Sequence, residues 1–568
     1  MANILVARAQ TTRAAGSLCK RLSLALPRLA PEGASTTVEM CHAERVVAAS
    51  YGGASVPPVC RDDQSGYTLV GSILGQTRVG DGVVEGSGAI ARWQPDGTLE
   101  VASDVTAGRT WWIGERDGVV VASTSMRAAT LVLGVHAWDA DALRWMLLTG
   151  ALAPRRSWNE HLRGLGPAET ACALPNAPWT YTQASWSFSE SSGSAAEIRD
   201  RVRGELQAAF ADIGRDTREW TLPLSGGVDS RAILSLWPDP KPPTVTWGAS
   251  AKRREPNGDA AVAAAVAEAY GVPNAFVALD GVAVDATTIT ERFIDSGEGR
   301  IDHTSGYMDG FALWRELAGQ GSGAVLRGDE AFGWSKVFRP LDTFTSVGMT
   351  ALVKWRGMPR EADTVLGGVT APLWTQRGAG ESLEDFRDRL YLEYRLPTVL
   401  AALTALKTPY VELANPLLQR RVLQMVRTLP AAWRTNKRAF LEALDGLGPN
   451  IPYAKLPSTE PASDLLRSEA LCQSIAETLR NSASSSPLPE ETSLYLADRV
   501  VAPRAEARSR KQHLEAFRGY VPSSWKPIAR VLLGKPTVQS RTWAFRMYLG
   551  AEMHRRLTED ATALAAFE

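Results

Sequence analysis

The chain has 568 residues, with 62 basic and 62 acidic side chains that give a formal net charge of zero. This length exceeds what one hydrophobic core organises, so we expect about two to four domains. The balanced charge provides no basic field for nucleic acid or anionic membrane, and no apolar run is long enough to span a bilayer.

The first 190 residues begin with a basic stretch and then indicate a β-rich region. The basic residues before residue 30 fit either a transit peptide or a helix with a solvated face, and we favour the helix; they are Arg8, Arg13, Lys20, Arg21 and Arg28. Short β-branched or aromatic runs cut by Gly and Asp predict strands at Gly66–Leu74, Ala89–Trp93, Thr98–Ala102, Thr110–Ile113 and Val119–Ser123. Helical spacing follows at Ala140–Leu148, and the polar stretch Ser185–Gly193 indicates a linker.

Residues from 195 to about 334 alternate between helical and strand patterns. An amphipathic helix is predicted at Ala195–Ile213 and an alanine-rich one at Asp259–Tyr270. Strands are predicted from Trp220 and at Thr244–Trp247, Ala275–Leu279 and Ala324–Leu326. Such alternation predicts a parallel sheet covered by helices, with ligands bound beyond the carboxyl ends of its strands.

The remainder of the chain, from about residue 340, has mostly helical patterns. Apolar periodicity predicts helices at Phe386–Leu396, Thr398–Leu406, Leu417–Leu429, Lys437–Leu444 and Ala462–Ala476. Asn481–Pro489 is rich in Ser and Pro and predicts a loop. The basic segment Arg499–Arg518 fits a solvated helix face or a binding patch for an acidic peptide segment.

The sequence from Trp220 to Leu234 contains the strongest functional signal. An apolar run breaks into Ser225-Gly-Gly-Val-Asp-Ser230 and then resumes with helical spacing, which predicts a strand, a tight loop and a helix. Glycines allow a ligand to approach the backbone, and the first helical turn offers unpaired N–H groups suited to pyrophosphate. Asp229 would repel phosphate unless a cation lay between them, so we interpret it as a Mg²⁺ ligand.

Two further clusters supply candidate catalytic groups. Gly328-Asp329-Glu330 follows the strand Ala324–Leu326, where Asp329 could complete a Mg²⁺ site with Asp229. Upstream, His303 is a candidate general base because an unperturbed imidazole titrates near working pH; it could equally orient a neighbour or cap a turn. Glu330 is the rival base.

Cysteine and histidine usage argues against disulfide scaffolding and zinc. The five cysteines have no CxxC spacing, and the six histidines form no metal-ligand cluster. A reducing cytoplasm is therefore the expected compartment.

The loop resembles the SGGxDS signature of the ATP pyrophosphatases, and the whole chain resembles the asparagine synthetase superfamily within that group. The resemblance implies that ATP is bound by Leu224–Ser230 and by the strand end at Trp247 and Gly248. It implies that Asp229 and Asp329 bind Mg²⁺, although Arg327 stands where the family has small residues. Lys455 matches the late family lysine that stabilises the acyl-adenylate, with Lys437 as the alternative and Tyr453 in place of the usual Arg.

The N-terminal half resembles the class II glutamine amidotransferase domain of asparagine synthetases, a β-sandwich flanked by helices. That domain uses a cysteine at its mature N-terminus, whereas this chain begins Met-Ala-Asn and its first cysteine is Cys19. We therefore expect a degenerate domain over residues 1–190 that does not hydrolyse glutamine. Residues 195–568 are expected to form an α/β ATP pyrophosphatase domain with a helical C-terminal region.

Together these features predict an ATP- and Mg²⁺-dependent, AMP-forming ligase that makes an amide bond. The degenerate N-terminal half, the change at Arg327 and the long helical region look most like lasso peptide cyclases, so the expected substrate is a precursor peptide. A leader-peptide-binding protein and a protease would be pathway partners. The alternatives are a small-molecule ligase like asparagine or β-lactam synthetase, and a non-catalytic ATP-binding protein that presents peptide.

Overall fold

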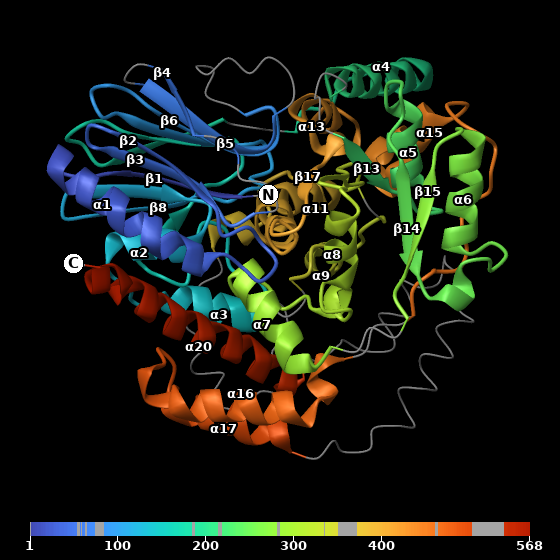
Figure 1. Cartoon of the computed structure of the whole chain (residues 1–568). Coiled ribbons are helices and arrows are strands. Elements are labelled where there is room, and N and C mark those ends of the chain that lie inside the picture. The colour runs from blue at the N-terminus through green and yellow to red at the C-terminus, as the bar shows by residue number, and fades with distance from the viewer. Residues whose placement is uncertain are drawn as a thin grey trace.

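A computed structural model describes the chain from Ala2 to Phe567 with internal gaps. The residues outside the description are 1, 54–56, 58, 63–64, 74–83, 185–187, 214–218, 281–283, 334, 350–371, 461–463, 503–538 and 568. Most of the basic segment 499–518 therefore lies outside the described residues. Figure 1 shows two β-sheets on one side of the molecule and a third sheet with its helices on the other.

The N-terminal region contains two six-stranded antiparallel sheets. The first has the order β10-β8-β9-β1-β3-β2. Its strands are β1 (Asn3–Arg8), β2 (Val38–Ala43), β3 (Val46–Tyr51), β8 (Trp112–Arg116), β9 (Val119–Ser123) and β10 (Arg163–Gly164). The second has the order β12-β11-β7-β6-β5-β4. Its strands are β4 (Cys60–Asp62), β5 (Ser65–Ile73), β6 (Gly86–Trp93), β7 (Leu99–Ser103), β11 (Glu169–Ala173) and β12 (Trp179–Gln183).

The two sheets pack face to face around one apolar cluster. Ile4 and Val6 of the first sheet share this cluster with Ala89 and Val101 of the second. The outer face of β1 is buried as well, because helices α1 (Thr12–Ala25) and α2 (Met126–Leu133) cover it. Burial on both faces explains why β1 is an apolar run rather than an alternating pattern.

The second half of the molecule is built on a five-stranded parallel sheet with the order β15-β14-β13-β16-β17. Its strands are β13 (Trp220–Pro223), β14 (Thr244–Gly248), β15 (Asn274–Ala278), β16 (Ala324–Leu326) and β17 (Glu412–Ala414). Its helices include α4 (Ala195–Ile213), α5 (Val228–Leu236), α6 (Asp259–Ala269), α7 (Ala286–Gly297) and α8 (Ala312–Gly319). The predicted α/β alternation is confirmed, and α4 and β16 have the predicted bounds.

The later helices differ in part from the sequence prediction. They are α9 (Pro340–Ser346), α11 (Leu383–Leu390), α12 (Ala401–Ala405), α13 (Arg420–Arg427), α14 (Ala431–Arg434), α15 (Arg438–Leu444), α16 (Glu469–Asn481), α17 (Glu490–Val501) and α20 (Ser540–Ala563). Helix α11 continues as η6 (Tyr391–Leu400), a π-helix that contains Pro397. The predicted run of helices is interrupted by β17, whose sequence Glu-Leu-Ala has no β-branched or aromatic residue to indicate a strand.

One N-terminal feature corrects the sequence interpretation. A helix does form near the basic N-terminus, but Arg8 is not on it: this residue ends β1 and is 3% exposed. Its Nη1 donates hydrogen bonds to the carbonyl oxygens of Gly97, Ala173 and Leu174, which explains how the charge is accommodated inside the sandwich.

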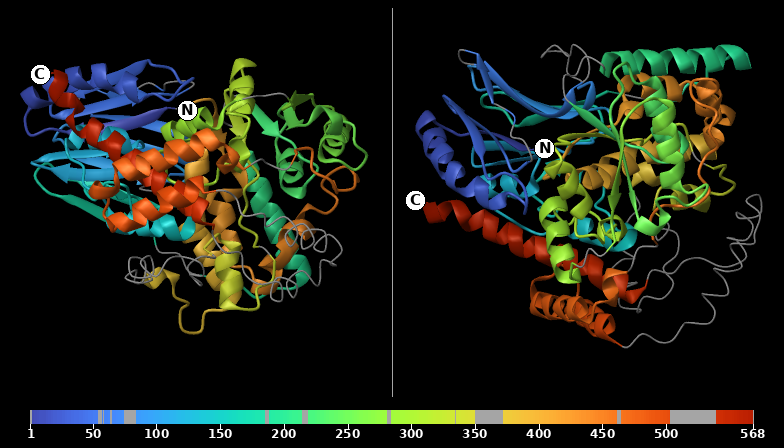
Figure 2. Two further views of the ribbon diagram at one scale, coloured as in Figure 1. Left: turned by 90° about the horizontal axis from the view of Figure 1, so that it is seen from below. Right: turned by 45° about the vertical axis from the view of Figure 1, so that its right-hand side comes forward.

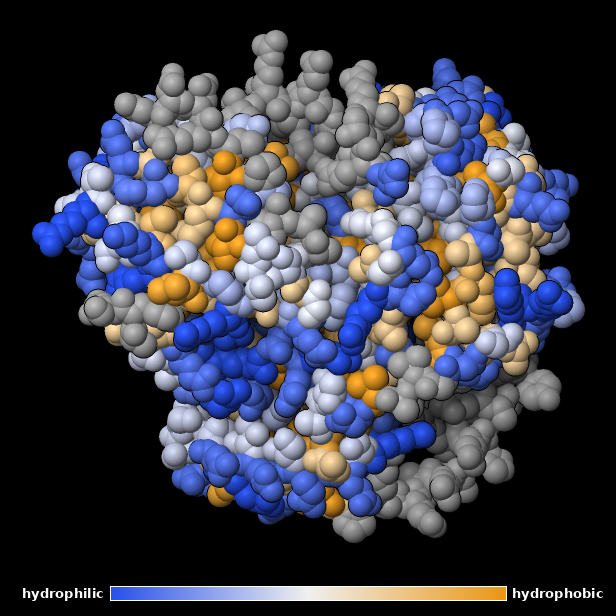
Figure 3. Space-filling view, viewed as in Figure 1, coloured by the Kyte–Doolittle hydropathy of each residue, from blue (hydrophilic) through white to orange (hydrophobic). Residues whose placement is uncertain are grey.

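Helix α20 joins the far end of the chain to the N-terminal sheets. It runs beneath them beside α2 and α3 (Ala140–Thr149), with α16 and α17 on its other side (Figures 1 and 2). Its buried side chains Trp543 and Met547 belong to the same apolar cluster as Leu143 of α3 and Leu5 of β1. The face in Figure 3 is mostly hydrophilic, with apolar residues in scattered patches.

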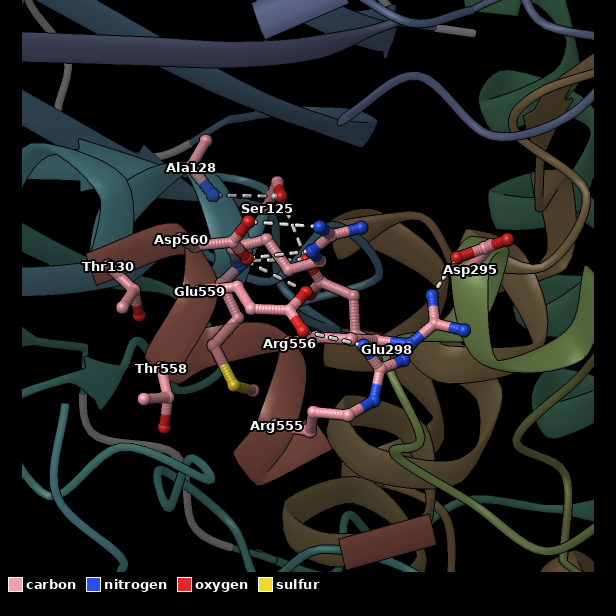
Figure 4. Close-up of polar contacts among 12 residues, drawn as sticks. Ser125, Ala128, Thr130, Asp295, Glu298, Arg555, Arg556, Thr558, Glu559 and Asp560 are labelled. Carbon is pink, nitrogen blue, oxygen red and sulfur yellow. Dashed lines mark hydrogen bonds and ion pairs between the residues drawn. The ribbon is translucent and has the colours of Figure 1, made fainter. Parts of the chain in front are cut away.

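Polar contacts reinforce this junction (Figure 4). The carboxylate of Glu298, just after α7, accepts hydrogen bonds from Ser125 Oγ at 2.8 Å and Met126 N at 3.0 Å, and so caps the N-terminus of α2. Arg127 of α2 forms a two-pronged ion pair with Asp560 of α20. Three segments far apart in sequence are thus held at one point. None of the described helices is long and apolar enough to cross a bilayer.

Candidate active site

The glycine loop between β13 and α5 has the predicted strand–loop–helix form. Its amides are held by side chains: Ser225 N donates to Ser230 Oγ at 3.0 Å, and Gly227 N donates to Ser225 Oγ at 3.2 Å. Gly226 N donates to Asp259 Oδ1 at 2.7 Å. Asp259 is the first residue of α6, where a negative charge suits the helix dipole, and its carboxylate also fixes the loop, which positions the turn before any ligand binds.

A cavity of about 390 Å³ lies beyond the carboxyl ends of β13 and β14. Its volume falls within the usual range for small-molecule sites, and its place is the one expected for a parallel sheet. The predicted residues that line it are Leu224, Ser225, Gly227, Trp247 and Lys455. Asp259 and Ser458 also line the cavity.

The segment 454–459 closes one side of this cavity and is attached to both strand ends. Ala454 N donates to Gly226 O at 3.1 Å, and Ser458 Oγ donates to Trp247 O at 2.7 Å. Side chains are excluded at two glycines: a Cβ on Gly226 would lie 2.4 Å from Ala454 Cβ, and one on Gly248 would lie 2.3 Å from Ser458 O. The glycines in the predicted nucleotide motif therefore also allow this segment to approach. Lys455 is exposed at the cavity.

Asp229 and Glu330 converge on one lysine. Lys437 Nζ lies 2.8 Å from Asp229 Oδ1 and 3.1 Å from Glu330 Oε1. Gly328 lies against this group, because a Cβ there would be 3.2 Å from Asp229 Cβ. The end of β16 and the start of α5 thus meet as predicted, although their carboxylates share an ammonium group.

Burial sets the electrostatics of this group. Glu330 is 5% exposed, and its desolvation raises the pKa of the carboxyl despite the nearby ammonium. Burial opposes the charge of Lys437, but Glu330 and Asp229 outweigh it and raise the pKa of the lysine. Lys437 therefore stays cationic at neutral pH, where it can attract the phosphates of a nucleotide.

Asp329 forms a second ion pair in the same region. Arg327 Nε lies 2.9 Å from Asp329 Oδ2, so the arginine that departs from the family pattern neutralises the predicted metal ligand. The described residues contain no group of three or more His, Cys, Asp or Glu side chains arranged for a metal ion. Two carboxylates still suit Mg²⁺, which commonly takes one or two from protein and its other ligands from phosphates and water. Asp229 and Asp329 therefore stay the predicted magnesium ligands, and in this structure each is paired with a cation.

His303 belongs to another part of the structure. Its Nδ1 lies 3.3 Å from Asp302 Oδ1, while Asp302 Oδ2 accepts a hydrogen bond from Arg546 Nε of α20 at 2.7 Å. Among the described contacts, His303 is not one of the residues that line the 390 Å³ cavity. The contact with Asp302 favours the interpretation that His303 orients a neighbouring side chain. The general-base role of His303 stays a prediction.

Two further cations, Arg231 and Lys407, were not among the predicted site residues. Arg231 lies just after the loop. It donates a hydrogen bond to Pro452 O at 2.8 Å and lies over the ring of Tyr453, so it holds in place the residues that precede Lys455. Lys407 is buried, donates to Leu403 O at 2.7 Å and lies near Arg327; burial lowers the pKa of its amine well below normal. Arg231 is adjacent to the motif, whereas no local pattern distinguishes Lys407.

Comparison with known proteins finds a family match in the part of the chain that contains this site. The family described as asparagine synthase matches residues 201–520, which is more than half of the sequence. The match includes the glycine loop, Asp329 and Lys455. No curated protein matches the chain.

Proposed function

Because the chain belongs to the asparagine synthase family, whose members are ATP-dependent ligases that form carbon–nitrogen bonds, we propose that it activates a carboxylate as an acyl-adenylate. The substrate carboxylate attacks the α-phosphorus of ATP and pyrophosphate leaves. An amine then attacks the acyl carbon, and AMP departs with the electrons of the broken acyl–phosphate bond. The amide forms as the amine loses its proton.

The observation that carries this proposal is the glycine loop, which lines the cavity and leads into α5, where Asp229 shares Lys437 with Glu330. We assign the adenine to the strand end at Trp247 and Gly248, and the phosphates to residues 225–230. Asp229 and Asp329 would hold Mg²⁺, which neutralises phosphate charge when bound. Lys437 and Lys455 supply positive charge for the leaving pyrophosphate and the acyl-adenylate, since fixed cations stabilise developing negative charge.

We further propose that the amine comes from the substrate itself rather than from glutamine. Cys19, the first cysteine of the sequence, lies within α1, and burial raises the pKa of its thiol. A thiol with a raised pKa is a poor nucleophile at neutral pH. The N-terminal sandwich is therefore proposed as a degenerate amidotransferase-like domain spanning residues 1–190.

The proposed substrate is a precursor peptide whose side-chain carboxylate is joined to its N-terminal amine, as in lasso peptide cyclases. Two large apolar side chains beside Lys455 support a peptide: Tyr453 is 52% exposed and Leu456 is 44% exposed. Exposed aromatic and aliphatic groups at a cavity provide contacts for a chain that extends outward. Holding the peptide prefolded would supply the proximity that ring closure needs.

The test measures nucleotide products and substrate mass with purified protein. Candidate peptides and free amino acids are incubated with ATP and Mg²⁺, and we expect AMP, pyrophosphate and a peptide that has lost one water. The variant Asp229→Asn should abolish pyrophosphate release, whereas Asp200→Asn on the exposed face of α4 should not. Conversion of amino acids alone would favour the small-molecule ligase, and ADP with phosphate would refute adenylation. Nucleotide binding without turnover of any substrate would favour the non-catalytic presenting protein.

A further inference from the structure

A second cavity of about 250 Å³ lies between the N-terminal sandwich and the helices of the other half. Trp112 and Leu165 line it from the sandwich side, and Trp374 and Pro397 line it from the other. It shares no lining residue with the proposed nucleotide cavity. The described structure therefore contains a separate space that adenylation does not use.

One wall of this cavity is the buried guanidinium of Arg300. The residue is 6% exposed, its Nη2 donates to Thr110 Oγ1 at 2.6 Å, and it lies over the ring of Trp112. Among the described residues it forms no ion pair with a carboxylate and no other side-chain hydrogen bond. A buried cation with most of its donors unused is costly unless an anion accompanies it.

The other charged side chains of the cavity already have partners. Arg155 lies 3.2 Å from Glu169, and Arg156 lies 3.1 Å from Asp139. Glu393 lies 3.6 Å from Arg389 on the same helix. Among the described residues, the guanidinium of Arg300 directly contacts the Thr110 hydroxyl and the Trp112 ring, so within this cavity it is the charge without an ion-pair partner.

The electrostatic surroundings of Arg300 agree with this geometry. Burial lowers the pKa of its guanidinium to about 10; Glu298 opposes the shift and the buried Arg109 adds to it. A bound anion would offset both the burial and the repulsion between the two arginines.

The wall opposite the sandwich is an unusual helix. Glu393, Pro397 and Thr398 all belong to the π-helix η6. Such helices are rare, and short π segments occur often at functional sites. The widened turns of this π-helix line the cavity. They are a second feature, besides the buried Arg300, that points to a ligand.

We propose that this cavity is a binding site for a small organic monocarboxylate. The carboxylate pairs with the free donors of Arg300, and the apolar part of the ligand packs against Trp112 and Trp374. Arginine suits a carboxylate because its planar donors match the two oxygens. The walls supply aromatic and aliphatic surface for a compact body, as in other small-molecule sites.

The test uses benzoate as the probe and benzamide as its neutral analogue, with binding measured by ligand-observed saturation-transfer NMR on the full chain. We expect benzoate to bind the wild type and benzamide to bind at least about tenfold more weakly. Arg300→Gln should weaken benzoate binding by about tenfold or more, since the charged donor is lost. Arg156→Gln is the matched control, because this arginine also lines the cavity but is already paired with a carboxylate. The affinity of this variant for benzoate should equal that of the wild type.

A second variant guards against misfolding of Arg300→Gln. Ala153→Phe places a ring into the cavity and should also abolish benzoate binding while the affinity for ATP is unchanged. The proposal is overturned if benzamide binds as well as benzoate or if a folded Arg300→Gln protein binds normally. It is also overturned if neither benzoate nor the smaller acetate and formate bind the wild type at about 10 mM, a concentration that detects even weak sites.

Discussion

The close contact between Gly226 and Ala454 gives the sharpest test of the site. Adding a methyl group in Gly226→Ala would place Cβ 2.4 Å from Ala454 Cβ and 3.2 Å from Val262 Cβ. Carbon atoms attract optimally at about 3.5 Å or more, so segment 454–459 would have to move by about 1 Å. Overpacking of this kind costs about 1–3 kcal/mol of unfolding free energy. The displaced segment carries Lys455 and lines the cavity, so nucleotide affinity should fall as well.

The assay compares urea unfolding and ATP affinity in a double-mutant cycle. Ala454→Gly removes the opposing methyl group, so Gly226→Ala with Ala454→Gly should recover most of the loss, leaving the tight contact with Val262. We expect a coupling free energy of about 1–2 kcal/mol between the two changes. Gly204→Ala in α4 is the control, since its Cβ would meet nothing within 4 Å. If Gly226→Ala behaves like wild type, or if Ala454→Gly gives no rescue, the steric argument is wrong.

Two further predictions concern buried charge. Lys437→Met should destabilise the fold by about 3 kcal/mol at pH 7.5, because Glu330 loses its buried partner. Since the pKa of Glu330 is raised in the folded state, the native protein binds more protons above the unfolded pKa, so stability falls as pH rises. Lys437→Met should steepen that fall in urea titrations from pH 5 to 8, and adding Glu330→Gln should flatten it; an unchanged slope contradicts the assignment. Arg434 is fully buried and pairs with two aspartates, so Arg434→Met should lower the unfolding free energy by about 3–5 kcal/mol. Arg438 forms an exposed pair, so Arg438→Met should lower it by less than about 1 kcal/mol in the same assay. Equal losses at the two arginines would refute the burial argument.

The sequence predicts the loop region well because its signals are local. A strand, two glycines and an amphipathic helix follow one another between Trp220 and Leu236, so adjacent residues determine the geometry. Because parallel strands end at a common edge, the sequence also predicted Asp329 beside Asp229. The structure instead joins Glu330 to Asp229 through Lys437 and pairs Asp329 with Arg327.

Other parts of the site depend on contacts that no local pattern contains. Lys437 meets Asp229 across 208 positions, and Ala454 meets Gly226 across a similar span. The sequence therefore identified Lys437 as a fallback without revealing its two carboxylate partners. His303 was chosen for its imidazole and its expected place near the mouth of the cleft, and the structure pairs it with Asp302, which in turn binds Arg546. Strand β17 escaped prediction because its sequence Glu-Leu-Ala has no β-branched or aromatic residue, whereas the equally short β16 contains Val325.

The place of α20 has a consequence for how the molecule is assembled during synthesis. Its buried residues fill the same apolar cluster as β1, α2 and α3, and Asp560, which forms an ion pair with Arg127, lies on α20. The ribosome makes this helix more than 500 residues after β1, so the sandwich emerges with that surface still bare. A fragment that ends before Ser540 should therefore expose the apolar surface that Trp543 covers in the full chain. It should need a chaperone, or a supplied peptide with the sequence of α20, to stay in solution.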